Sequence, residues 1–276
     1  MFIVLKTEKI SEGFIKRRKQ LKRLCRNEPI SYPTENGLHF FVLDIPENLS
    51  GAMLTATEEK CGRYVSRIVA PKSLFLPDSG KVKRFKPVYS NGFFVLNTAI
   101  DAFEKASLRP EETCITVVDR NARMSGEIHR LLPYASLVRA ITSRPERYCG
   151  ECNRIFDDCG ASVTVRTDYQ PVRKSEIIIC CDGATTDGMK NSAVFSFRRS
   201  NHGRLRFFSE EIELSANHKK AVPENIDTAH FAAAVTELCA STEYRLSPFS
   251  RTEISCNGCN NATVSECLRC YAQQKQ

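Results

Sequence analysis

Four cysteines near the C-terminus form two pairs, each with two residues between its members. They are Cys256, Cys259, Cys267 and Cys270, and seven residues separate the two pairs. Two-residue spacing lets both thiolates of a pair face one tetrahedral ion, and four sulfur ligands close its coordination sphere. The pattern predicts a structural zinc that staples the tail. An iron–sulfur cluster or unligated thiols are the alternatives, because iron prefers the same ligands.

A second group of polar residues follows the predicted strands of the central region. These residues are Asp119, Arg120, Ser143, Arg144, Arg147, Asp182 and Gly183. Open α/β sheets bind ligands beyond the carboxyl ends of their strands, and arginines near a helix start pair well with phosphate. We therefore expect a binding site for a nucleotide or another anion here. The alternative is that the arginines are solvated helix-start residues and Asp119 is a turn residue.

The elements that must position these residues alternate in type along the chain. Short β-branched runs at residues 113–119, 136–142, 161–166 and 176–181 predict strands, and residues 124–132 and 145–159 predict helices between them. This alternation indicates a mostly parallel sheet with helices on both faces. Two later strands, at 193–198 and 205–214, are expected to form a hairpin across 200–203, and a helix is expected to start at an Asp227 cap.

The segment Thr142-Ser143-Arg144-Pro145-Glu146-Arg147 resembles the one by which shikimate dehydrogenases and glutamyl-tRNA reductases hold the 2′-phosphate of NADP. Residues 175–180, followed by Gly183, are similar to the fourth strand of the same cofactor domain. The resemblance covers roughly 70 residues and implies a Rossmann-like domain with NADP as cofactor. Where that family has a glycine-rich loop, residues 118–126 contain one glycine, Gly126, and the arginines Arg120 and Arg123.

The first hundred residues predict a mixed α/β region. Strands are expected at residues 2–6, 38–45 and 73–76, and a helix at 52–69. A basic helix at residues 14–26 carries seven Lys or Arg between Lys16 and Arg26, with an apolar stripe between them. Such a helix can bind nucleic acid, or it can be an ordinary amphipathic helix with its charges in water.

Composition is that of an ordinary soluble protein, with 42% hydrophobic and 26% charged residues among 276. No apolar run approaches the roughly 20 residues needed to cross a bilayer, and the N-terminus lacks signal-peptide character, so a cytoplasmic protein is expected. The 13 cysteines are then expected to be reduced. A net charge of +8 favours anionic partners.

Three parts are predicted: a mixed α/β region at 1–110, a Rossmann-like domain at 111–245, and a cysteine-rich tail at 246–276. The leading hypothesis is a protein that binds a nucleotide or another phosphate-bearing ligand, distantly similar to NADP-dependent oxidoreductases. The alternative is a non-catalytic scaffold or regulatory protein with a structural zinc, and nucleic-acid binding is third. The sequence identifies no catalytic residue and predicts neither a reaction nor an oligomeric state.

Overall fold

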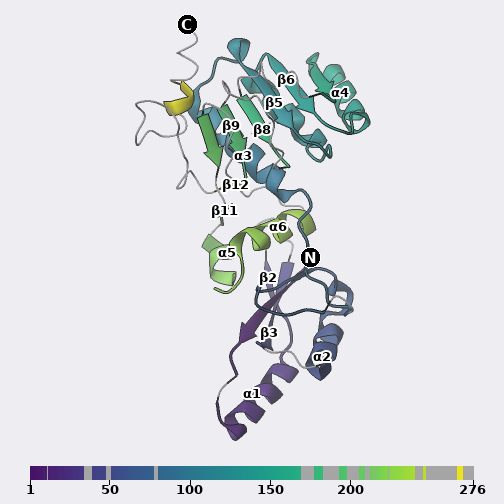
Figure 1. Ribbon diagram of the computed structural model, residues 1–276, viewed down its shortest axis with the longest axis vertical. Coiled ribbons are helices and arrows are strands. Elements are labelled where there is room, and N and C mark those ends of the chain that lie inside the picture. The colour runs from purple at the N-terminus through teal and green to yellow at the C-terminus, as the bar shows by residue number, and fades with distance from the viewer. Residues whose placement is uncertain are drawn as a thin grey trace. The chain divides into compact units, whose positions relative to one another are not determined.

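The computed structural model divides the chain into two compact units, shown in Figure 1. Unit 1 comprises Met1–Val88 and Leu214–Glu243, and unit 2 comprises Tyr89–Glu213 and Tyr244–Gln276. Within these units the structure describes residues 1–10, 12–33, 39–47, 51–77, 80–168, 177–182, 193–197, 205–208, 212–214, 216–222, 224–239, 245–246 and 266–269.

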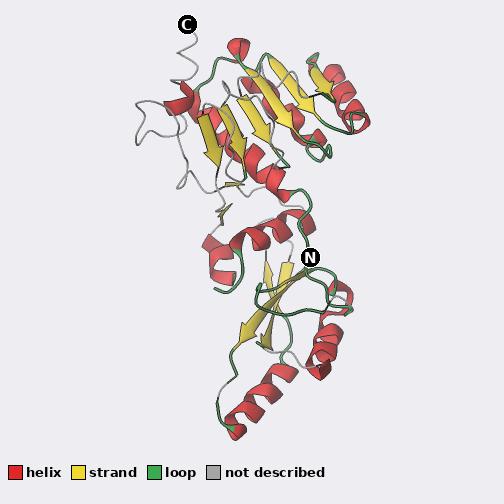
Figure 2. Ribbon diagram, viewed as in Figure 1, coloured by secondary structure: helices red, strands yellow, loops and turns green. Residues whose placement is uncertain are grey.

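Unit 2 is built on a six-stranded sheet (Figure 2). Its strands are β5 (Cys114–Val118), β6 (Leu137–Ile141), β7 (Val163–Arg166), β8 (Ile177–Cys180), β9 (Ala193–Ser196) and β10 (Leu205–Phe208). They lie in the order β10-β9-β8-β5-β6-β7, and every neighbouring pair is parallel. All four residues of β8 are buried, as expected for a central strand covered on both faces. The predicted α/β class with a mostly parallel, Rossmann-like sheet is confirmed.

Three helical segments of unit 2 contact its strands, and the middle one also contacts the other two. They are α3 (Ser90–Ala106), the 3₁₀ helix η3 (Ser125–Tyr134) and α4 (Glu146–Cys159). Two smaller features complete the unit: the 3₁₀ turn η2 (Pro110–Glu112), and the antiparallel pair β11 (Ile212–Glu213) and β12 (Arg245–Leu246). As predicted, α4 stops at Gly160, whose φ of 67° places it in the left-handed region that favours glycine.

Unit 1 has a four-stranded sheet in the order β2-β3-β1-β4. Its strands are β1 (Ile3–Glu8), β2 (Ile30–Pro33), β3 (His39–Pro46) and β4 (Ile68–Val69). Its helices are α1 (Phe14–Arg26), α2 (Gly51–Cys61), the 3₁₀ turn η1 (Gly62–Tyr64), α5 (Ala216–Ala221) and α6 (Thr228–Leu238). The predicted Asp227 cap is confirmed, because its carboxylate accepts the backbone N–H groups of Ala229 and His230 at 2.9 and 3.3 Å.

Several local predictions were wrong. Residues 125–134 form a 3₁₀ helix, in which the Glu127 N–H bonds the Met124 carbonyl three residues back, at 3.0 Å. β9 and β10 pair in parallel, so the predicted hairpin does not form. The predicted helix at 52–69 ends at Cys61, and β4 occupies its last residues. Residues 73–76 are not a strand, and the Leu74 carbonyl accepts a bond from the Arg84 guanidinium at 2.8 Å.

The two units divide the chain differently from the three predicted parts. The sequence placed boundaries at residues 110 and 245, whereas α3 contacts β8 and β9 in unit 2 and α6 contacts β4 in unit 1. The packing of α3 and α6 therefore decides which unit each helix belongs to, and the sequence pattern does not show this packing. No helix in the described part of the chain is long and apolar enough to span a membrane.

Candidate functional site

The sheet of unit 2 changes direction between β5 and β8. From β5 the chain adds β6 and then β7 on one side, and β8, β9 and β10 follow on the other side. In sheets of this order, ligands bind beyond the carboxyl ends of the strands where the direction reverses. Asp119 and Arg120 follow β5, and Cys181 and Asp182 follow β8. The topology thus brings together residues that the sequence singled out, while Gly183 lies outside the described residues.

Asp119 anchors the turn after β5. Its side chain is buried, with only 1% exposed. One carboxylate oxygen accepts the backbone N–H of Arg123 at 3.0 Å, and the other accepts the backbone N–H of Met124 at 2.7 Å and the hydroxyl of Tyr148 at 2.9 Å. Burial, followed by the Asp119 charge, raises the pKa of Tyr148, so this hydroxyl remains a donor. Asp119 therefore holds the turn closed and has few lone pairs left for a ligand.

Asp182 reaches the same turn from β8. Its carboxylate accepts the Asn121 backbone N–H at 3.2 Å and lies 3.5 Å from the Asn121 side-chain nitrogen. The backbone N–H of Arg120 also stabilises its charged form. Burial, followed by the charge of Asp119, raises the pKa of Asp182, while these N–H groups and Arg123 act in the opposite direction. Two carboxylates from different strands therefore meet at one turn.

The pyrophosphate of a dinucleotide does not fit the turn after β5. Rossmann folds that bind dinucleotides offer bare backbone N–H groups at this turn. Here the amides of residues 121, 123 and 124 bond the two carboxylates, the Arg120 amide stabilises the charged form of Asp182, and the Ala122 N–H bonds the Asp119 carbonyl at 3.0 Å. Each pair of unit negative charges about 4 Å apart would cost about 4 kcal/mol at an effective dielectric constant of about 20. The strand order is that of a dinucleotide site, but carboxylates of the protein already occupy the first turn.

The turn between β6 and α4 lies beside the first turn and is held to it. The buried Thr142 hydroxyl donates to the Arg120 carbonyl at 3.1 Å and accepts the Arg144 backbone N–H at 3.1 Å. The Ser143 backbone N–H donates to the same Arg120 carbonyl at 3.0 Å. The two turns are therefore one connected structure at the carboxyl edge of the sheet.

The side chains of Ser143, Arg144 and Arg147 project from the β6–α4 turn into solvent. No described carboxylate forms an ion pair with either arginine. No side chain caps α4 either, since Pro145 occupies its N-cap. The structure thus places the three predicted anion-binding residues at one helix start, and their donors are available to a ligand.

Sequence reasoning missed Tyr148 and Gly92. Tyr148 lies on the buried face of α4, and its hydroxyl meets Asp119. Helical spacing could have placed Tyr148 on the inward face of α4, but nothing in the local sequence indicates its partner. A Cβ added at Gly92 of α3 would lie 3.1 Å from the Cβ of Cys181 and 3.1 Å from the Sδ of Met124. Gly92 therefore allows α3 to approach the end of β8.

Cys181 lies at this edge but lacks the properties of a nucleophile. It is buried, and burial followed by the Asp119 and Asp182 charges raises the pKa of its thiol well above the ordinary value. The thiolate is the reactive form of cysteine, so this environment suppresses it. Cys181 is therefore a core residue of unit 2.

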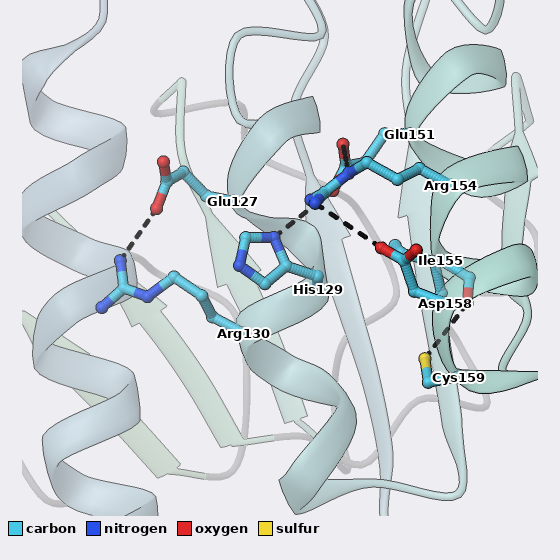
Figure 3. A network of polar contacts seen from close by, with 8 residues as sticks. All are labelled: Glu127, His129, Arg130, Glu151, Arg154, Ile155, Asp158 and Cys159. Atoms are coloured by element: carbon cyan, nitrogen blue, oxygen red, sulfur yellow. Dashed lines mark hydrogen bonds and ion pairs between the residues drawn. The ribbon is translucent and has the colours of Figure 1, made fainter.

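A network of charged side chains joins η3 to α4 (Figure 3). Glu151 of α4 accepts bonds from Arg154 at 2.6 and 3.1 Å and pairs with His129 of η3 at 3.3 Å. On the other side of η3, Arg130 bonds Glu127 at 3.0 Å and Asn97 of α3 at 2.9 Å. Such partly exposed pairs usually contribute less than about 1 kcal/mol each. The network therefore links η3 to both α3 and α4 within unit 2.

The predicted zinc site falls mostly outside the described residues. Cys267 lies in a described segment and is buried, whereas Cys256, Cys259 and Cys270 lie outside those segments. Among the residues that the structure describes, no group of three His, Cys, Asp or Glu is arranged to hold a metal ion. Zinc binding therefore remains a prediction from cysteine spacing.

Comparison with known proteins finds little. No family model matches the chain, and no curated protein matches it. Among solved structures, the L-tryptophan dehydrogenase from Nostoc punctiforme is similar at 10% identity and a TM-score of 0.28, over 86% of this chain and 73% of that one. A likeness this low indicates no ligand or activity. The Rossmann-like character of unit 2 rests on its own strand order and parallel pairing.

Proposed function

We propose that unit 2 binds a small molecule through a phosphate group at the β6–α4 turn, with Ser143, Arg144 and Arg147 as ligand residues. One observation carries the proposal: two exposed guanidinium groups, unpaired among the described residues, lie at the uncapped start of a 14-residue helix. Two arginines flank Glu146, the acidic residue of the first turn, so the helix start keeps a net positive charge, which is unfavourable near a helix N-terminus. A bound anion removes this penalty.

Phosphate is the anion that these groups fit. Guanidinium groups form paired, charge-assisted bonds to phosphate oxygens, and the positive end of the helix dipole favours an anion at the same position. The Ser143 hydroxyl adds a further donor. The net charge of +8 attracts anions from a distance.

The position of the turn favours a nucleotide. In Rossmann folds, residues beyond the second strand contact the ribose, and an arginine there accommodates the 2′-phosphate of NADP. β6 is the second strand of this sheet. The segment 142–147, which resembles the 2′-phosphate site of NADP-dependent oxidoreductases, follows it directly. A nucleotide with a phosphate on its ribose is therefore the leading ligand class, and we assign no reaction.

A thermal-shift titration with adenosine 2′-monophosphate, NADP and ATP tests the proposal. A ligand at about 100 times its dissociation constant should stabilise the protein by about 2.7 kcal/mol. The double substitution Arg144→Ala/Arg147→Ala should abolish the shift. Arg109→Ala is the matched control, because Arg109 is an exposed arginine that precedes the amino end of β5. No shift with any ligand would overturn the proposal and favour a non-catalytic scaffold.

A second candidate function concerns α1 of unit 1, and the exposure of its charges supports it. Lys16, Arg18, Lys19, Lys22 and Arg26 are exposed. The helix is anchored at other points: Arg23 pairs with Glu8, and the Lys60 ammonium caps the C-terminal end at the Asn27 carbonyl.

Lys19, Lys22 and Arg26 follow helical spacing along one face, which suits contacts to a phosphate backbone. We propose nucleic acid as the partner of this face. Affinity should fall steeply with salt, with a slope of about 0.9 per phosphate contact for duplex DNA. Replacing these three residues by Ala should lower that slope, and salt-independent binding or none would exclude the candidate.

A further inference from the structure

The turn after β5 differs from a dinucleotide-binding turn because the protein supplies its own anion. Asp119 is buried and holds the amides of Arg123 and Met124, so it forms part of the turn itself. Asp182 is different: it comes from another strand, its residue is exposed, and it meets the turn from outside. Its carboxylate accepts the backbone N–H of Asn121, and the backbone N–H of Arg120 stabilises its charged form.

The groups around the Asp182 carboxylate are those that bind phosphate elsewhere. Two successive backbone N–H groups and the Asn121 side-chain amide approach it, and the Arg123 guanidinium acts on it as the nearby positive charge. Successive backbone N–H groups that converge in this way form an anion-binding concavity. The concavity is present in this protein, and a carboxylate fills it.

We propose that Asp182 takes the anion position of this turn and thereby restricts the ligand of unit 2 to a phosphate monoester, excluding dinucleotides whose diphosphate must cross the turn. This inference rests on the proposed phosphate site at the β6–α4 turn and specifies its ligand class. Ligands such as adenosine 2′-monophosphate fit, since their single phosphate meets Arg144 and Arg147. NADP does not fit, because its diphosphate would have to displace Asp182.

The test uses the full-length protein and three probes: adenosine 2′-monophosphate, inorganic pyrophosphate and NADP. Wild type should bind the monophosphate by isothermal titration calorimetry, and its heat with pyrophosphate should disappear in Arg144→Ala/Arg147→Ala, because only the β6–α4 turn is open to pyrophosphate. Asp182→Ala opens the amides of Arg120 and Asn121, so its affinity for pyrophosphate and NADP should rise by at least about tenfold, which is the effect of one good charge-assisted bond. Its affinity for the monophosphate should change by less than about threefold.

Asp157→Ala is the matched control. Asp157 is an exposed carboxylate on α4, far along the helix from its start, so its removal changes the net charge equally without opening the turn. Equal gains in pyrophosphate affinity for Asp182→Ala and Asp157→Ala would show a general charge effect and overturn the inference. An unchanged affinity of Asp182→Ala for pyrophosphate would also overturn it.

Two further measurements separate this inference from the proposed function. In the Arg144→Ala/Arg147→Ala background, the gain of pyrophosphate binding on Asp182→Ala should persist, whereas monophosphate binding should be lost. If wild type fails to bind the monophosphate, the proposed function is refuted. A higher affinity of Asp182→Ala for pyrophosphate would then still support Asp182 in the anion position. Nuclear magnetic resonance gives a test that keeps Asp182: in Arg144→Ala/Arg147→Ala, pyrophosphate should leave the amide signals of Arg120 and Asn121 unmoved, and a shift of either would refute the inference.

Discussion

Replacing Asp119 by Ala should destabilise unit 2 by about 3–5 kcal/mol. The carboxylate accepts three bonds, from the amides of Arg123 and Met124 and from the Tyr148 hydroxyl. Leaving a buried donor without a partner costs about 1–3 kcal/mol. The Met124 amide and the Tyr148 hydroxyl are both buried, and the Arg123 amide is partly buried. The loss would be a large fraction of the 5–15 kcal/mol that is usual for a whole domain.

Tyr148→Phe removes one of the three bonds and leaves no donor unpaired, so it should cost about 1–2 kcal/mol. The two substitutions act on one contact. The double variant Asp119→Ala/Tyr148→Phe should therefore be less destabilised than the sum of the single variants, with a coupling of at least about 1 kcal/mol.

Urea unfolding followed by circular dichroism measures these losses, since the chain has no tryptophan for fluorescence. Hydrogen exchange at the β5 amides assigns the loss to unit 2, because two units can unfold separately. Asp157→Ala, which removes an exposed carboxylate, should stay within about 0.5 kcal/mol of wild type. A similarly small effect for Asp119→Ala would refute the idea that its carboxylate holds the turn.

Three other predictions concern pH, thiols and metal. The folded-state pKa of Asp182 is raised above 3.8, so its contribution to stability is present below that value and is lost as pH rises through the folded pKa. Urea midpoints of Asp182→Asn, measured against pH, should lack this loss. Parallel pH profiles for wild type and Asp182→Asn would contradict the prediction. Iodoacetamide at about pH 8 should label the exposed Cys149 long before Cys180, whose pKa burial raises to about 12, as peptide mass spectrometry would show. Elemental analysis should find about one zinc per chain, lost in Cys256→Ser/Cys259→Ser, and iron or no metal would show that assignment wrong.

The sheet of unit 2 was predictable because its signals are local. The run Ile177-Ile178-Ile179 is apolar on both faces, which is typical of a central parallel strand, and all three residues are buried in β8. Gly160 marks the end of α4 by a backbone conformation that most residues avoid. Signals of this kind depend on a few neighbouring residues, so they can be recognised without knowing how the rest of the chain packs.

The contacts of the first turn were not predictable because they join distant residues. Tyr148 meets Asp119 across 29 positions, and Asp182 meets Asn121 across 61. Nothing in the local sequence indicates that a carboxylate at the end of β8 will bond amides after β5. The parallel pairing of β9 with β10 is similar, since the turn residues between them favour a hairpin and the register is decided by the rest of the sheet.

Filling the first turn also changes how a ligand can stabilise this protein. In a glycine-rich turn, the N–H groups lack protein partners, so binding of a diphosphate supplies bonds that the free protein lacks. Here the amides of residues 121–124 all have protein acceptors, and Ala122 adopts a left-handed φ of 53° to close the turn. The turn is complete without a ligand, so the gain on binding must come from the β6–α4 turn alone. Ligand-induced protection from hydrogen exchange should therefore appear at residues 143–148 and not at 120–124, and protection of the first turn by ligand would contradict this account.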